Sequence, residues 1–114
     1  SRVPELQAVP ESVSVDGQLR DYIIKLARAT RNDDRVEVGV SPRGVQRLFE
    51  ASRSRAVIGG RDYVVPDDIK AVVRQTFGHR LVLTSESTVR GVEHVDIVED
   101  ILDQIEVPAV AAAD

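Results

Sequence analysis

An arginine in the first turn of an expected helix is the residue of this chain best placed for chemistry. The segment Gly39-Val40-Ser41-Pro42-Arg43-Gly44 opens that helix and puts Arg43 beside its first backbone N–H groups. A helix N-terminus carries partial positive charge, so a cation there loses about 0.3 to 1 kcal/mol that an acidic residue would gain. A cation beside unpaired N–H groups suggests a site that an anion such as phosphate completes.

The chain carries no motif for catalysis of its own. No segment fits the phosphate-binding loop G-x-x-x-x-G-K-[ST], and no Ser, His and Asp residues stand in a recognisable arrangement. The acidic pairs Asp33-Asp34 and Asp67-Asp68 fall in a loop and at a helix start, where capping explains them. The absence of cysteine and the presence of only two histidines leave few zinc ligands. We therefore predict neither a metal site nor catalysis by this chain alone.

Length and composition indicate one globular domain. The chain has 114 residues, of which 42% are hydrophobic and 30% charged. No apolar run approaches the roughly 18 residues of a membrane span, and no signal peptide is recognisable, so we expect a cytoplasmic protein without a membrane partner. Because the chain begins Ser1-Arg2 and contains no methionine, we interpret it as a piece excised from a larger protein.

The net charge of −4 conceals a division along the chain. Residues 20–61 hold ten Lys and Arg against five Asp and Glu, whereas residues 62–114 hold four against eleven. A basic middle and an acidic end could bind one another or face different partners. Ordinary solvated helix faces account for such clusters equally well.

Four segments have the apolar spacing of amphipathic helices. Asp16 can cap the first helix, which we expect to end near Asn32. Ser41 is a favoured N-cap for the second helix, Pro42 suits its first position, and Gly59-Gly60 supplies the stop. The expected buried positions are Leu19, Tyr22, Ile23, Leu26, Ala27 and Thr30 in the first helix and Val45, Leu48, Phe49, Ser52 and Ala56 in the second.

The third and fourth helices follow the same rules. Val65-Pro66 begins the third helix and Gly78 ends it, while the fourth runs from Val92 or Glu93 to Glu106. We predict a loop for residues 79–91. The expected buried positions are Ile69, Val72, Val73, Thr76 and Phe77 in the third helix and Val95, Val98, Ile101, Leu102 and Ile105 in the fourth.

These elements predict an all-α fold, a compact four-helix bundle with short connections. Two β-like pieces in the loops, at 36–40 and 81–84, could form a minor short pairing. Residues 1–15 contain two prolines and suit an extended linker better than a core element. We therefore expect a linker over 1–15, a helical domain over 16–108 and a disordered tail over 109–114.

Six segments in a fixed order resemble the C-terminal lid of the MoxR family of AAA+ ATPases, and the similarity runs from about Val13 to Pro108. They are Asp21-Tyr22-Ile23, Thr30-Arg31, Gly39 to Gly44, Gly60-Arg61-Asp62-Tyr63-Val64, Pro66-Asp67-Asp68-Ile69 and His79-Arg80-Leu81. The resemblance implies that the helical domain is an AAA+ lid.

The resemblance also implies a role for one arginine. In that family the arginine of the Ser-Pro-Arg segment, here Arg43, is the sensor II residue that reaches the γ-phosphate of ATP. The ATP and Mg²⁺ would be held by an α/β core of the same protein, and none is expected on this piece alone. Arg61 and Arg80 are secondary candidates for contacts with the core or a neighbouring subunit. Local salt bridges to Asp62 or to the acidic tail would explain both arginines equally well.

The implied partners are the AAA+ core of the same chain, neighbouring subunits in a ring oligomer and von Willebrand A domain proteins, in a chaperone-like remodelling activity. The chain departs from the family at Gly44, where alanine is common, and at Val65, where a capping threonine is common. The glycine leaves room for close approach of a ligand or neighbouring chain. The valine predicts a weaker helix cap.

Two other classes of function stay open. The order of helices is also reminiscent of a histone-like or other helical nucleic-acid-binding domain, but the negative charge and the scarcity of lysine, only Lys25 and Lys70, oppose it. We therefore expect no nucleic acid partner. The other alternative is a pure protein-interaction module that docks through the acidic fourth helix.

Overall fold

Side-chain caps set the starts of the two longest helices. In the computed structural model, which describes residues 13–109, α2 spans Gly17–Arg31 and α3 spans Pro42–Ile58. The Asp16 carboxylate accepts a hydrogen bond from a first-turn N–H of α2 at 2.8 Å. Ser41 does the same for the first turn of α3, at 3.3 Å. Both starts are those that the sequence predicts.

The other two expected helices are α4, Pro66–Gly78, and α6, His94–Gln104. Val65 offers no side-chain cap to α4, in agreement with the sequence. The Asp68 carboxylate instead accepts a hydrogen bond from the Val65 N–H at 2.8 Å, and Asp96 makes the same contact at the start of α6. A carboxylate three residues into each helix thus stabilises a start that lacks a good cap.

A fifth helix, α5, spans Ser85–Val89, where the sequence predicted a loop. Thr84 caps it, because its hydroxyl accepts a hydrogen bond from the Ser87 N–H at 3.1 Å. The prediction was wrong here because a single turn of mostly polar residues has no apolar spacing to reveal it. The described residues therefore form four main helices and this short one.

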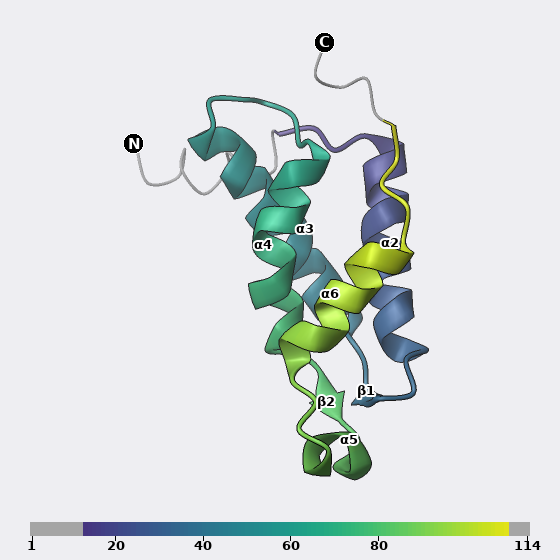
Figure 1. Ribbon diagram of the computed structural model, residues 1–114. Helices are drawn as coiled ribbons and strands as arrows, with labels where there is room; N and C mark the ends of the chain where they lie inside the picture. The colour runs from purple at the N-terminus through teal and green to yellow at the C-terminus, as the bar shows by residue number, and fades with distance from the viewer. Residues whose placement is uncertain (1–12, 110–114) are drawn as a thin grey trace.

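The helices pack around one another with a small sheet at one end (Figure 1). The two helices α3 and α4 lie side by side, and α6 packs against both α4 and α2. The strands β1, Val36–Val38, and β2, Val82–Leu83, form an antiparallel pair at the lower end of Figure 1, beside α5. The pairing expected between the two loops is thus confirmed, as is the mainly helical fold.

The core draws apolar side chains from α2, α3, α4 and α6. The predicted face of α2 is buried throughout, whereas Val45 and Phe49 of α3 are only partly buried. On α6 the buried face is rotated from the predicted one: Val95 is 45% exposed, and Ile97 is fully buried in its place. The largest fully buried side chains are Tyr22, Phe77, Leu19, Ile23, Leu26, Leu48, Ile69, Ile97, Val40, Val64, Val73 and Val98.

Part of the expected linker belongs to the folded domain. Val13 and Val15 are buried in the core, and between them Ser14 forms a parallel bridge with Tyr63. The Ser14 N–H donates to the Asp62 carbonyl, and the Val64 N–H donates to the Ser14 carbonyl, both at 3.0 Å. Val13 to Val15 are therefore an extended segment of the folded domain, joined to residues 62–64 by an isolated bridge, and not part of a linker. Residues 1–12, and the expected tail beyond Ala109, lie outside the described residues.

The last turn of α2 holds the segment that leads into α3. The Thr30 hydroxyl donates to the Ala27 carbonyl at 2.6 Å and accepts from the Val40 N–H at 2.9 Å, while Arg31 Nε donates to the Val40 carbonyl at 2.9 Å. A Cβ on Gly39 would lie 2.8 Å from the backbone of Arg31. Glycine is needed there because the two backbones touch, and the start of α3 is thereby fixed.

Replacing Gly39 with alanine should lower the free energy of unfolding by about 1 to 3 kcal/mol, since the new methyl group must displace rigid backbone. Gly17→Ala is the matched control, because a Cβ at Gly17 meets nothing within 4 Å. Urea denaturation of both variants measures the difference. Equal stability of the two variants would contradict the close approach described for Gly39.

Candidate functional site

Arg43 stands in the first turn of α3 with its charge uncompensated. The side chain is exposed, and within residues 13–109 it forms no hydrogen bond or ion pair. Pro42 precedes it at the first helical position, and the Ser41 cap fixes the turn. The backbone around Arg43 is therefore rigidly placed, while its guanidinium keeps all of its donors for a partner outside the domain.

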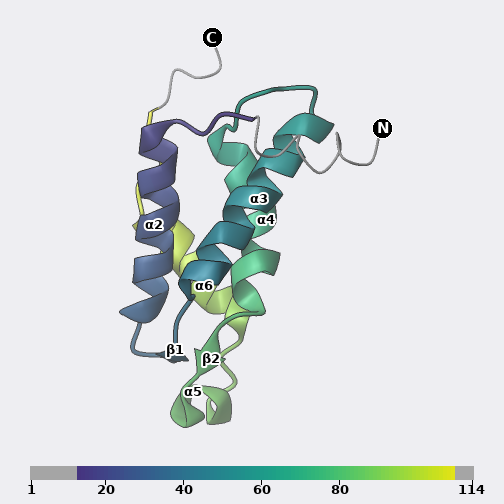
Figure 2. The same cartoon turned by 180° about the vertical axis from the view of Figure 1, so that it is seen from behind.

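Gly44, in the first turn of α3, lies against Arg80, which follows α4. The two helices run side by side (Figure 2). A Cβ at Gly44 would lie 2.6 Å from Val40 Cγ1 and 2.9 Å from Arg80 Cδ. The sequence suggested that this glycine leaves room for a ligand or a neighbouring chain. The structure corrects that interpretation, because the space is filled from within the domain by Val40 and by the aliphatic stem of Arg80.

The surface between Arg43 and Arg80 is shallow and mainly basic. A hollow of about 240 Å³ is lined by Arg43, Gln46, Arg47 and Glu50. A second hollow of about 470 Å³ is lined by Arg47, Glu50, Ala51, Ser54, Gln75, Thr76, His79 and Arg80. Arg47 pairs with Glu50 at 3.2 Å and borders both hollows. The two share one surface, with three arginines and one carboxylate.

Arg61, the remaining candidate, lies in the connection between α3 and α4, at the far end of α3 from Arg43 (Figure 1). Its guanidinium binds the Asp68 carboxylate through two hydrogen bonds, at 2.7 and 2.8 Å, and also donates to the Tyr63 carbonyl. The partner is thus Asp68, and neither Asp62 nor the acidic tail. The geometry gives Arg61 an internal, structural role.

The environment of Asp68 favours its charged form. Burial opposes ionisation, but the hydrogen bonds from Arg61 and from the Val65 N–H outweigh it, so the pKa of Asp68 lies below its ordinary value. The Asp68 side chain is 3% exposed. A buried carboxylate with three hydrogen bonds ties the connection between the helices to the first turn of α4.

Replacing Arg61 with alanine should lower the free energy of unfolding by about 1 to 3 kcal/mol, because it leaves the buried Asp68 carboxylate short of partners. The control Arg90→Ala removes an arginine from an exposed pair with Glu86 and should change stability by less than about 0.5 kcal/mol.

The cost of Arg61→Ala should also depend on pH. A lowered folded-state pKa stabilises the fold above the unfolded pKa of about 3.9, and this contribution is lost as the pH falls. The difference between wild type and Arg61→Ala should therefore shrink from about pH 5 downward, as Asp68 becomes neutral. Urea titrations from pH 7 to pH 3 measure it. A difference that stays constant with pH would contradict this account.

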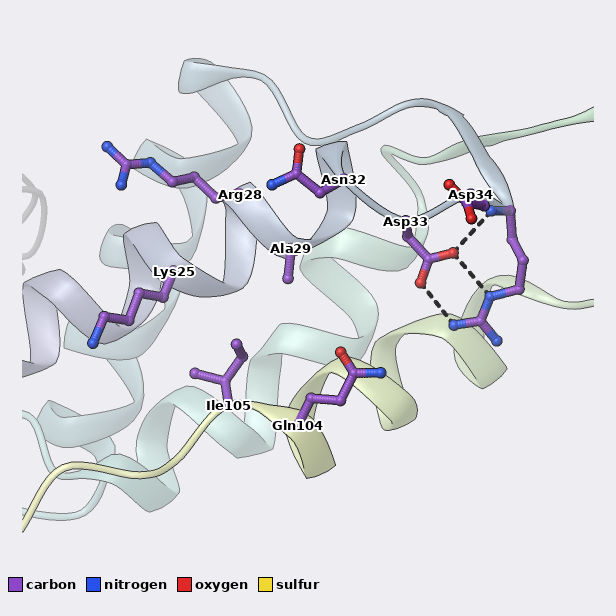
Figure 3. Close-up of a pocket in the computed structure, with 9 residues that line it drawn as sticks. Lys25, Arg28, Ala29, Asn32, Asp33, Asp34, Gln104 and Ile105 are labelled. Atoms are coloured by element: carbon purple, nitrogen blue, oxygen red, sulfur yellow. Dashed lines mark hydrogen bonds and ion pairs between the residues drawn. The ribbon is translucent and has the colours of Figure 1, made fainter.

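A further hollow of about 600 Å³ does not include Arg43 (Figure 3). It lies where the ends of α2 and α6 meet, and the sequence analysis did not single it out. Arg35 closes one side: it binds Asp33 and, 65 residues away, Asp100, each at 2.7 Å. Hydrogen bonds from Arg35 hold the pKa of Asp33 below its ordinary value, although burial opposes them. The lining residues are Lys25, Arg28, Ala29, Asn32, Asp33, Asp34, Arg35, Gln104 and Ile105.

Within residues 13–109, no group of three or more His, Cys, Asp or Glu side chains is arranged to hold a metal ion. No helix in the same range has the length and apolar character to cross a membrane.

A family model described as the AAA lid domain matches residues 28–101. The chain belongs to the AAA lid domain family. YeaC, an uncharacterized protein of Bacillus subtilis, is 35% identical over 108 residues, which cover 95% of this chain and 34% of YeaC. Chaperone MoxR1 of Mycobacterium tuberculosis is 31% identical over 116 residues, covering 94% of this chain and 31% of MoxR1. The resemblance to the lid of MoxR-family AAA+ ATPases is thus confirmed.

Structure gives the same result. A crystal structure of a candidate ATPase from Cytophaga hutchinsonii superposes on this chain with a TM-score of 0.86 and 28% sequence identity. The match covers 91% of this chain and 34% of that one. The lid therefore spans about one third of the length of the relatives that it matches.

The structure brings two of the three candidates together. Arg43 and Arg80 flank the first turn of α3, and Arg61 lies at the opposite end of that helix. Thr30 and Arg31 belong to the segments that resemble the MoxR lid, but the sequence pattern indicated no function for either. Their contacts with Val40 depend on a chain reversal that helical spacing does not reveal.

Proposed function

We propose that this domain is the C-terminal lid of a MoxR-type AAA+ ATPase and that Arg43 acts as its sensor II residue. The observation that carries the proposal is an exposed arginine, without partner among the described residues, on a helix start that two hydrogen bonds to Val40 and a close backbone contact at Gly39 hold in place. ATP and Mg²⁺ would be bound by the α/β core of the same cytoplasmic protein.

The chemistry of Arg43 suits that role. A guanidinium stays charged at all physiological pH values and presents a planar fork of donors to phosphate oxygens. ATP supplies the γ-phosphate whose negative charge such a fork stabilises, both before and during transfer. A contact that exists with ATP but not with ADP would make the position of the lid follow the nucleotide state.

The wider activity follows from the family. We propose that the parent protein forms a ring oligomer and couples ATP hydrolysis to chaperone-like remodelling of partners such as von Willebrand A domain proteins. The lid would contact both its own core and a neighbouring subunit. The name of the relative MoxR1, a chaperone, supports this proposal.

The alternative of a docking module rested on the acidic fourth helix, α6. Two of its acids already have partners inside the domain: Glu99 pairs with Arg74, and Asp100 pairs with Arg35. Two of the four acidic residues of α6 are thus paired within the domain, which lowers the charge available to a basic partner and favours the lid over the docking module.

Arg43→Ala in the full-length protein should lower kcat for ATP about 100-fold, the scale for removing one donor to a developing negative charge. Arg55→Ala is the matched control, since Arg55 is also an exposed arginine of α3 but lies in its last turn. Steady-state ATPase assays compare the two, and thermal melting checks that both fold. Equal turnover in both variants would sink the sensor assignment.

The 114-residue chain alone should hydrolyse no measurable ATP, because the proposal places the phosphate-binding loop and the Mg²⁺ ligands elsewhere in the protein. A phosphate-release assay on the purified chain measures this. A rate that survives further purification and is lost on denaturation would overturn the lid proposal.

A further inference from the structure

Arg80 is the second cation beside the start of α3, and its place there is built into the packing. A Cβ at Gly44 would lie 2.9 Å from Arg80 Cδ and 3.6 Å from Arg80 Nε. Any larger residue at Gly44 would push the stem of Arg80 away from the helix. The other end of the side chain is held as well, because Arg80 Nη1 donates to the Thr76 carbonyl in the last turn of α4 at 3.0 Å.

The guanidinium of Arg80 has no counter-charge. Within residues 13–109 no carboxylate pairs with it, and the side chain is exposed. Arg47, which borders the same hollow, is paired with Glu50. Arg80 therefore keeps donors free for an anion from outside the domain, whereas Arg47 is already partly neutralised.

Arg43 and Arg80 border one surface. Successive residues project about 100° apart around a helix. Arg43 precedes Gly44, the position that the stem of Arg80 covers, so the two arginines lie on adjoining sides of the first turn of α3. The hollows that hold them share Arg47 and Glu50. Glu50 on this surface is paired with Arg47, so neither Arg43 nor Arg80 has a paired carboxylate among the described residues, and an anion that touches both would be stabilised by two positive charges.

We propose that Arg80 is a second phosphate-binding residue of the lid, which contacts the triphosphate of ATP together with Arg43. This inference rests on the proposed lid function. Arg43 approaches from the start of α3, and Arg80 approaches from the end of α4. A triphosphate held by both would connect two helices, so the lid would bind it through its most extensively packed helix pair.

The test uses the full-length protein and fluorescently labelled ATP. Arg80→Gln removes the guanidinium but keeps part of the stem over Gly44, and it should weaken ATP binding about tenfold or more, because it removes a hydrogen bond between two charged groups. Arg80→Lys keeps the charge but loses the fork, so its Kd should lie between the two. Arg90→Ala, in the exposed pair near α5, is the control and should bind ATP like the wild type.

The outcomes separate this inference from the sensor proposal. A Kd for ATP within twofold of wild type in Arg80→Gln overturns the role of Arg80, even when Arg43→Ala lowers turnover. Smaller rings in light scattering, together with unchanged ATP binding, would make Arg80 a subunit contact and also overturn it. Weaker ATP binding in Arg80→Gln with intact rings supports it, and normal turnover in Arg43→Ala would then refute only the sensor assignment.

Discussion

The hydrogen bonds of the last turn of α2 to Val40 are the constraint on which the rest of the site depends. Thr30 and Val40 lie ten positions apart in the chain, yet the Thr30 hydroxyl joins them directly, inside the core. An unpaired buried N–H costs about 1 to 3 kcal/mol, so this contact strongly favours one path for the chain. Once Val40 is fixed, the Ser41 cap and the first turn of α3 have one place to form.

The arginines of this lid divide into those that the fold uses and those that it leaves free. Arg61 binds the buried Asp68 carboxylate, and Arg35 joins Asp33 to Asp100. The buried Asp68 carboxylate fixes the guanidinium of Arg61, and hydrogen bonds to two carboxylates fix that of Arg35. Arg43 has no such partner among the described residues, and Arg80 has only a carbonyl. An arginine on a rigid backbone and without a carboxylate partner is well placed to bind an anion from outside the domain.

Much of the fold follows from local rules in the sequence. Asp16, Ser41 and Pro42 mark the helix starts because caps act within one turn, and the apolar face of α2 is complete in its 3.6-residue spacing. The misses have equally physical causes. A polar single turn hides α5. Ser14, between Val13 and Val15, pairs with a segment about 50 residues away, so neither valine looked like core beside two prolines.

The site was only partly predictable for the same reason. Arg43 could be found because its position in a helix start is a local feature, with a charge that opposes the helix dipole. The neighbourhood of Arg80 could not, since Gly44 and Arg80 lie 36 residues apart and meet only after α3 and α4 pack. Gly44 itself was the usable signal, because a glycine in a helix has a lower helix propensity than alanine and so suggests a close neighbour. The neighbours are Val40 and the aliphatic stem of Arg80, so the packing that requires glycine at this position also places a second arginine beside the first turn of α3.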